Sequence, residues 1–333
     1  MPGLRKIADF IALKRSMVAM LAMVILVGMG ERMAERFLPI YLMALGGGAI
    51  TIGLLGGLQN LLGALYSFPG GYLSDRIGVK RALLIFNLMA MTGFVIVILI
   101  PSVYAVLVGA FFFLAWSAIS LPATMGLVAR VLPSNKRTMG VSMHSLVRRV
   151  PMSLGPVLGG LFIGIWGEVL GVRLAFAAAL AMAIVALIMQ QILIEPDRLR
   201  THSSNTPKAE KNPFKLWRLM NSDMKNLLVS DILIRFCEQI PYAFVVVWAM
   251  KTITSPVTAV EFGVLTAIEM ATAVLCYIPV AYWADKTAKK PFVVITFLFF
   301  TIFPLILLYS HSFWPLAFAF FIRGLKEFGE PTR

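Results

Sequence analysis

The sequence is poor in the residues that soluble enzymes use for catalysis and metal binding. Its 333 residues include only three histidines and two cysteines, and charged residues make up 14%. Cys237 and Cys276 fall inside apolar runs, so they supply neither a disulfide framework nor a metal-binding spacing. No glycine-rich stretch continues into the lysine of a nucleotide-binding loop. We therefore expect no bound metal, no cofactor and no ATP-driven mechanism.

Acidic residues are scarce as well, whereas apolar residues dominate. The chain has 16 acidic and 30 basic residues, is 59% hydrophobic and has a mean hydropathy of +0.85, which is outside the range of soluble domains. Apolar runs of about 20 residues between charged connections are typical of transmembrane helices. The sequence predicts an all-α polytopic membrane protein with spans at residues 17–44, 50–72, 81–100, 103–131, 139–165, 171–194, 225–250, 258–283, 291–309 and 313–333.

The net charge of +14 reflects orientation rather than nucleic-acid binding. Basic residues precede the first run, follow the second, fourth and eighth, and crowd the connection after the sixth. The connections on the other side carry only Arg173 and Lys251. By the positive-inside rule, the N-terminus and the central connection are cytoplasmic. We expect a multi-pass protein of a bacterial or archaeal plasma membrane, with the lipid bilayer but no nucleic acid as a partner.

The longest polar stretch divides the chain into two parts. Residues 1–194 form a predicted six-helix bundle, and residues 224–333 form a second bundle of about four helices. The linker at 195–223 contains residues 212–220, where basic and apolar residues alternate, which indicates a helix lying on the membrane surface.

The two parts repeat each other. The segment GGYLSDRIGVKR at 70–81 is echoed by AYWADKTAKK at 281–290, and Arg32 and Glu35 are echoed by Arg235 and Glu238. Gln59 corresponds to Glu269 with the offset that separates Asp75 from Asp285. Parallel repeats around a central site are common in secondary transporters. By the same offset residue 333 corresponds to residue 123, so we expect a chain that stops inside its tenth helix.

With these motifs the sequence resembles the major facilitator superfamily. The family's motif between helices two and three is matched by Gly71, Leu73, Ser74, Asp75, Arg76, Gly78 and Lys80, and a weaker copy contains Asp285 and Lys286. A family motif of helix five is matched by Gly155, Pro156, Gly159 and Gly160.

The resemblance implies two bundles around a central cavity, in a monomer. It also implies that Asp75 and the repeated segment act as a conformational switch. The helix-five glycines are found in drug-proton antiporters, but plain close packing of helices explains them as well.

Ionisable residues inside spans are the strongest functional candidates, because each is costly in lipid unless it is paired or hydrated. Asp231, Arg235, Glu238 and Tyr242 share one face of their helix, as do Arg323, Lys326, Glu327 and Glu330. Such a polar stripe is expected to face a cavity.

We expect these side chains to divide into two roles. Candidates for substrate binding are Arg32, Glu35, Arg148, Arg149, Arg235, Tyr242 and Arg323. Candidates for proton coupling are Asp231, Glu238 and Glu269, of which Glu269 has no cation near it in its own helix. The alternative for each residue is a static ion pair, such as Arg32 with Glu35.

The sequence thus predicts a secondary active transporter of a small solute that works by alternating access. Proton coupling is expected, by symport or by drug-type antiport with efflux. The alternatives are a related protein that acts as a sensor or scaffold, and an inactive fragment. A membrane enzyme is disfavoured, because no nucleophile and base, or set of metal ligands, can be assembled.

Overall fold

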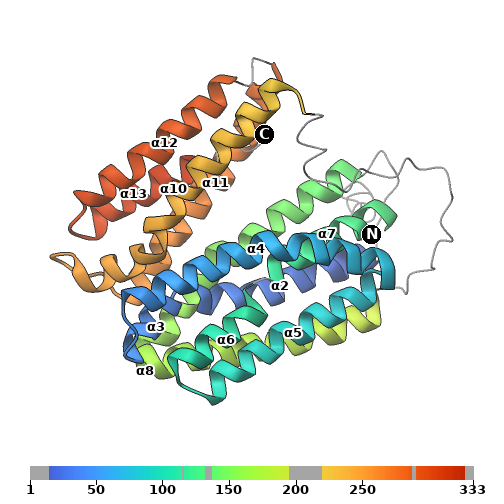
Figure 1. Cartoon of the computed structure of the whole chain (residues 1–333), viewed down its shortest axis with the longest axis horizontal. Coiled ribbons are helices and arrows are strands. Elements are labelled where there is room, and N and C mark those ends of the chain that lie inside the picture. Colours follow the sequence, from blue (N-terminus) through green and yellow to red (C-terminus); the bar gives the residue numbers. More distant parts are fainter. Residues whose placement is uncertain (1–14, 115, 132–136, 195–219, 287–289, 327–333) are drawn as a thin grey trace, which may run out of the picture.

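The computed structural model describes residues 15–114, 116–131, 137–194, 220–286 and 290–326, and in these the regular elements are all helical. They form two bundles (Figure 1). The first contains α2 (Arg15–Glu35), α3 (Leu38–Ala44), α4 (Ala49–Ile77), α5 (Val79–Leu99), α6 (Val103–Phe113), α7 (Trp116–Val131) and α8 (Arg137–Leu193). The second contains α10 (Ser222–Val247), the π-helical turn η2 (Trp248–Thr252), α11 (Ala259–Lys286), α12 (Lys290–Leu308) and α13 (Phe313–Leu325).

The helices cover the expected spans, but those expected at 17–44 and 103–131 are each divided, into α2 and α3 and into α6 and α7. In the described residues, six helical segments are long and apolar enough to cross a membrane, and α6 and α13 are shorter apolar helices. The two spans expected at 139–165 and 171–194 are joined in α8. They are separated within it by Gly167, which has a φ of 79°. Glycine adopts this conformation without steric cost, so one residue turns the chain from one span into the next. Linker residues 195–219, including the expected surface helix, lie outside the described residues.

The first bundle is held together by an aromatic cluster and a buried polar network. Phe94, Phe113 and Phe176 have ring centroids 5.2–5.7 Å apart. Asn87 donates to Gln190, and Trp116 donates to Asn87 across 2.7 Å. Buried polar groups need such partners in an apolar medium. The network connects α5, α7 and α8 in a fixed register.

The segment at 70–81 is not a loop, contrary to the sequence-based prediction. Helix α4 continues to Ile77 and α5 begins at Val79, so only Gly78, with a φ of 89°, lies between them. The charged residues before the turn extend the helix, and the glycine alone provides the reversal. Lys80 donates to the backbone carbonyl of Gln191 at 2.7 Å, which ties this turn to the end of α8.

The rest of the expected switch motif is only partly described. Gly71 lies in α4 near Pro122, and Arg76 is exposed. The side chains of Asp75, Asp285 and Lys286 lie outside what the structure describes, although all three residues belong to α4 or α11. The role of the motif as a switch therefore stays a prediction.

The glycines of α8 face two different helices. A Cβ on Gly155 would lie 2.7 Å from the Arg32 Cβ atom, and one on Gly159 would collide with the Met33 carbonyl oxygen of α2. Gly160 instead faces the backbone of Ala259 in α11, across the boundary between the bundles. About one turn earlier in α8, the Pro156 carbonyl oxygen packs against Gly263 of α11, where a Cβ would lie only 2.5 Å from it. The glycines thus let α8 pack closely against α2 of its own bundle and against α11 of the second bundle.

Gly159→Ala is expected to destabilise the protein by about 1–3 kcal/mol, because the added methyl group forces α8 away from α2. Gly57→Ala is the matched control, since nothing lies within 4 Å of its added Cβ. Alanine should stabilise that helix by up to about 1 kcal/mol. Thermal unfolding of both purified variants measures the difference. Equal melting temperatures would contradict the tight contact.

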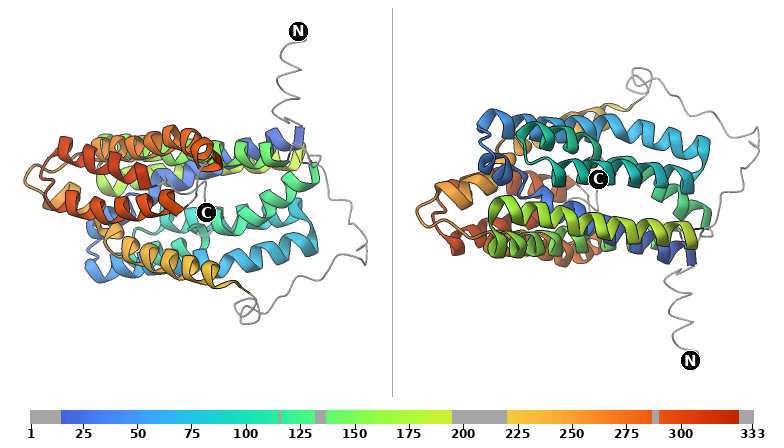
Figure 2. Two further views of the ribbon diagram at one scale, coloured as in Figure 1. Left: turned by 90° about the horizontal axis from the view of Figure 1, so that it is seen from above. Right: turned by 90° about the horizontal axis from the view of Figure 1, so that it is seen from below.

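The two bundles meet at one end of the molecule. Besides the α8–α11 contact, Gly56 of α4 faces Ala243 of α10, and Lys251 forms an ion pair with Glu168. These residues lie near the α3 and η2 end, where the ribbons converge, whereas the ribbons diverge toward the opposite end (Figure 1). In the views from above and below, the two bundles overlap (Figure 2). The two bundles therefore form a V whose closed end lies at α3 and η2.

Candidate functional site

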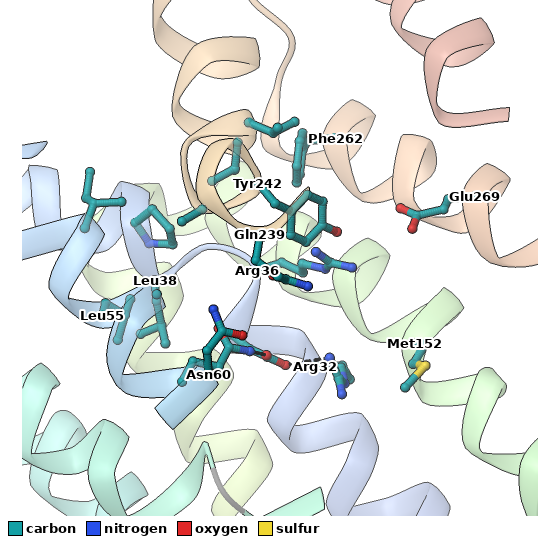
Figure 3. Close-up of a pocket in the computed structure, with 18 of the residues that line it drawn as sticks. Arg32, Arg36, Leu38, Leu55, Asn60, Met152, Gln239, Tyr242, Phe262 and Glu269 are labelled. Atoms are coloured by element: carbon teal, nitrogen blue, oxygen red, sulfur yellow. Dashed lines mark hydrogen bonds and ion pairs between the residues drawn. The ribbon is translucent and has the colours of Figure 1, made fainter. Parts of the chain in front are cut away.

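A cavity of about 270 Å³ lies between the bundles and is lined by both of them (Figure 3). The first bundle contributes residues of α2, α3, α4 and α8, and the second contributes residues of α10, α11 and α13. Its ionisable lining residues are Arg32, Glu35, Arg36, Glu269, Arg323 and Lys326. Charged side chains at this depth are tolerable because they share a polar cavity and pair with each other.

On the first-bundle wall, Glu35 is held by two partners. The Arg32 guanidinium lies 2.9 Å from the Glu35 carboxylate, one helical turn away in α2. Gln59 of α4 donates its amide N–H to the other oxygen of the same carboxylate. This carboxylate is therefore neutralised by a cation and oriented by an amide, which fixes α4 against α2 at the cavity.

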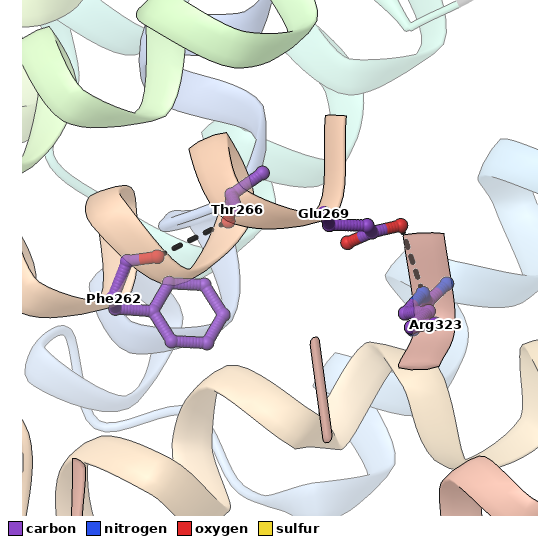
Figure 4. Close-up of polar contacts among 4 residues, drawn as sticks. All are labelled: Phe262, Thr266, Glu269 and Arg323. Atoms are coloured by element: carbon purple, nitrogen blue, oxygen red, sulfur yellow. Dashed lines mark hydrogen bonds and ion pairs between the residues drawn. The ribbon is translucent and has the colours of Figure 1, made fainter. Parts of the chain in front are cut away.

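On the second-bundle wall, Glu269 and Arg323 form a buried ion pair (Figure 4). The Arg323 Nε atom donates to Glu269 across 2.9 Å, and the side chains are only 3% and 2% exposed. Gly324 makes this possible, because a Cβ there would lie 2.6 Å from the Thr272 Cβ atom of α11. The close approach of α13 to α11 brings Arg323 to the carboxylate.

Glu269 was expected to have no cation near it in its own helix, and this pair shows that α13 supplies one instead. Its partner is far away in the sequence and lies on another helix, so spacing within one helix cannot reveal it. The choice of Glu269 as a candidate for proton coupling does not depend on that expectation alone. Its role in proton coupling stays a prediction.

Tyr242 connects the two walls. Its ring centroid lies 4.6 Å from the Arg36 Cζ atom of the first bundle and 3.4 Å from the Arg323 Cζ atom of the second. The Phe303 ring also lies 4.9 Å from Arg323 Cζ. Aromatic faces attract guanidinium groups, so one neutral ring from α10 holds cations of both bundles.

The structure brings together some of the predicted site residues. Arg32, Glu35, Tyr242, Glu269 and Arg323 line the cavity. The described residues Arg148 and Arg149 of α8 and Asp231 of α10 are not among its lining residues. The side chains of Arg235 and Glu238 lie outside the described set, as do Glu327 and Glu330.

Asn60 and Gln239 also line the cavity and were not selected from the sequence, whereas Lys326 belongs to the polar stripe that was expected to face a cavity. Arg36, one of the first-half arginines expected to hold an anionic group, lies four positions after Arg32 and so near it on a helical surface. Gln239 is adjacent to Glu238 and has no such periodic signal. In the described residues no three potential metal ligands are grouped.

Solved structures of transport proteins have the same fold. A bacterial homolog of the human lysosomal transporter Spinster, inward-facing and unoccupied, superposes with a TM-score of 0.74 at 15% identity over 95% of this chain and 73% of that one. A mutant of the nucleoside transporter NupG gives 0.73 at 13% identity over 93% and 79%. A mutant of the peptide transporter POT gives 0.72 at 14% identity over 94% and 79%. At these identities the likeness shows the fold alone.

The sequence itself supplies the family. Residues 20–249, more than half of the chain, match the Major Facilitator Superfamily. The chain belongs to that superfamily, which confirms the resemblance found in its motifs, and it is an integral, multi-pass membrane protein of a transporter family. None of the curated proteins matches it.

Proposed function

We propose that the protein is a secondary active transporter that carries a small solute by alternating access and couples this to protons through Glu269. The observation that supports this best is the cavity itself, in which ionisable residues of both bundles meet between two bodies whose described contacts include those near the α3 and η2 end. Rocking of the bundles would close the open end and open the closed one. The open end holds Arg15, Ile194 and Met220, the described residues next to the N-terminal segment and the linker, so by the positive-inside rule this end faces the cytoplasm.

The buried pair suggests how a proton could be coupled to the solute. Arg323 compensates the negative charge of the Glu269 carboxylate. A solute anion that attracts Arg323 would leave Glu269 buried with less compensation, and burial favours the protonated form of a carboxylate. Solute and proton would then be bound together, which favours symport over antiport.

Proteoliposomes loaded with a pH-sensitive dye test the proposal. A panel of carboxylates, sulfonates, amino acids, dipeptides and nucleosides is added outside, and the internal pH is followed. A solute-dependent proton flux that is absent from protein-free liposomes would support it. If no solute moves protons, and a proton gradient drives no solute accumulation, the proposed coupling is wrong.

The Lys251–Glu168 ion pair should contribute to closure of the end where the bundles meet. Lys251→Glu places two carboxylates together and is expected to favour opening there, but only by about 1 kcal/mol or less, since the pair is partly exposed. The double variant Lys251→Glu with Glu168→Lys should restore closure. Labelling of a cysteine placed at Gly56 measures access from this end. Unchanged labelling in the single variant would exclude this role.

A further inference from the structure

We propose that the cavity selects an organic anion with an apolar body, and that Arg36 is the residue that anchors the anionic group. This inference rests on the proposed function, because it names the class of solute for the same cavity. It follows from how the charges of the lining residues are distributed.

Among the lining residues that the structure describes, cations outnumber acids. Four of the cavity's ionisable lining residues are basic and two, Glu35 and Glu269, are acidic. Glu35 pairs with Arg32, and Glu269 pairs with Arg323. Both carboxylates thus already have a cation as partner, and among the described lining residues Arg36 has no such carboxylate partner.

Arg36 is the residue best placed to anchor the anionic group of a solute. Among the side chains that the structure describes, no carboxylate lies within ion-pair distance of it, and its one aromatic contact is with Tyr242 at 4.6 Å. An aromatic face attracts the positive charge but does not accept N–H groups as a carboxylate would. A guanidinium held in this way can still bind a carboxylate or sulfonate through two parallel hydrogen bonds.

The remaining wall is largely apolar, which defines the other part of the solute. Leu38, Ile52 and Leu55 approach from the first bundle, and Val246, Phe262 and Met270 from the second. These side chains favour an alkyl or aromatic group, while the amides of Asn60 and Gln239 in the same lining can hold a polar substituent on it. A cationic solute would be repelled by the Arg36 guanidinium.

Binding of three matched probes to the purified full chain in a neutral detergent tests the inference. Hexanesulfonate carries a permanent negative charge, hexyltrimethylammonium a permanent positive charge, and 1-hexanol none. We expect hexanesulfonate to bind most tightly by isothermal titration calorimetry. Arg36→Gln should weaken its binding at least about tenfold, because a charge-assisted hydrogen bond is lost. Arg36→Lys should give an intermediate value, and Arg81→Gln, an exposed arginine outside the cavity, should change nothing.

A second measurement uses the unaltered protein, so it does not depend on the folding of a variant. Phenylglyoxal modifies arginine side chains, and mass spectrometry locates the modified positions. Hexanesulfonate should protect Arg36 severalfold and leave Arg81 unprotected. Equal modification of Arg36 with and without the sulfonate, tighter binding of the ammonium probe, or wild-type affinity in Arg36→Gln would each overturn the inference.

The results separate this inference from the proposed transport. Arg36-dependent binding of the sulfonate without uptake of any solute into liposomes would leave the anion site standing and contradict transport. Proton-driven uptake of a cationic or neutral solute, without uptake of anions, would leave transport standing and contradict the anion site.

Discussion

Glu269→Gln is expected to abolish solute accumulation driven by a pH gradient, while exchange of labelled for unlabelled solute across the membrane continues. Glutamine can still accept the hydrogen bond from Arg323 but cannot take up a proton, so the cavity keeps its shape and loses its coupling. Removing a positioned proton-transfer group reduces a rate by about 100-fold or more. Uptake into proteoliposomes at equal and unequal pH measures both activities, with a solute identified in the panel above.

Glu261→Gln is the matched control for this experiment. Glu261 lies in the same helix, but its carboxylate accepts hydrogen bonds from Thr258 at the start of α11, outside the cavity. Its loss should weaken a helix cap by about 1 kcal/mol and leave the coupling intact. Undiminished pH-driven accumulation in Glu269→Gln would remove this residue from the mechanism.

Arg323→Met is expected to destabilise the protein strongly. It leaves the Glu269 carboxylate, which is 2% exposed, without its ion-pair partner. Removing one partner of a buried pair costs about 3–5 kcal/mol, because the other charge stays buried. The melting temperature of the purified variant in detergent should fall by several degrees.

The double variant Arg323→Met with Glu269→Gln identifies the cause. It removes both charges, so most of the lost stability should return, and the two effects should be strongly non-additive. Arg173→Met is a suitable comparison, since Arg173 donates to the carbonyl of Ile98 at 2.9 Å and belongs to no ion pair in the described residues. A double variant as unstable as the sum of both single variants would show that the two residues do not act as a pair.

The sequence was sufficient for the helical architecture and for one wall of the cavity. Spans are revealed by local apolar runs, and these depend only on the thickness of the bilayer. Arg32 and Glu35 are three residues apart in one helix, so their ion pair follows from helical geometry. The repeat also placed Gln59 and Glu269 in corresponding positions, and both line the cavity.

The contacts between helices could not be derived in the same way. Glu269 meets Arg323 because Gly324 lets α13 approach α11, and nothing in the spacing of either helix specifies that neighbour. Tyr242 was selected for its place on a polar face, but its contact with Arg36 depends on how the bundles meet. The continuation of α4 up to Gly78 was missed because charged residues were taken to end the helix.

The rocking of the two bundles is the central claim, and distances between spin labels test it most directly. Labels at Tyr72 and Met224, which are 53% and 58% exposed, report the open end. Labels at Ile50 and Thr254, both exposed, report the closed end, and Cys237 and Cys276 are replaced by serine. Double electron–electron resonance in liposomes, with and without a proton gradient and bound solute, should show the first distance shortening as the second lengthens. Two distances that stay constant, or that change in the same direction, would contradict alternating access.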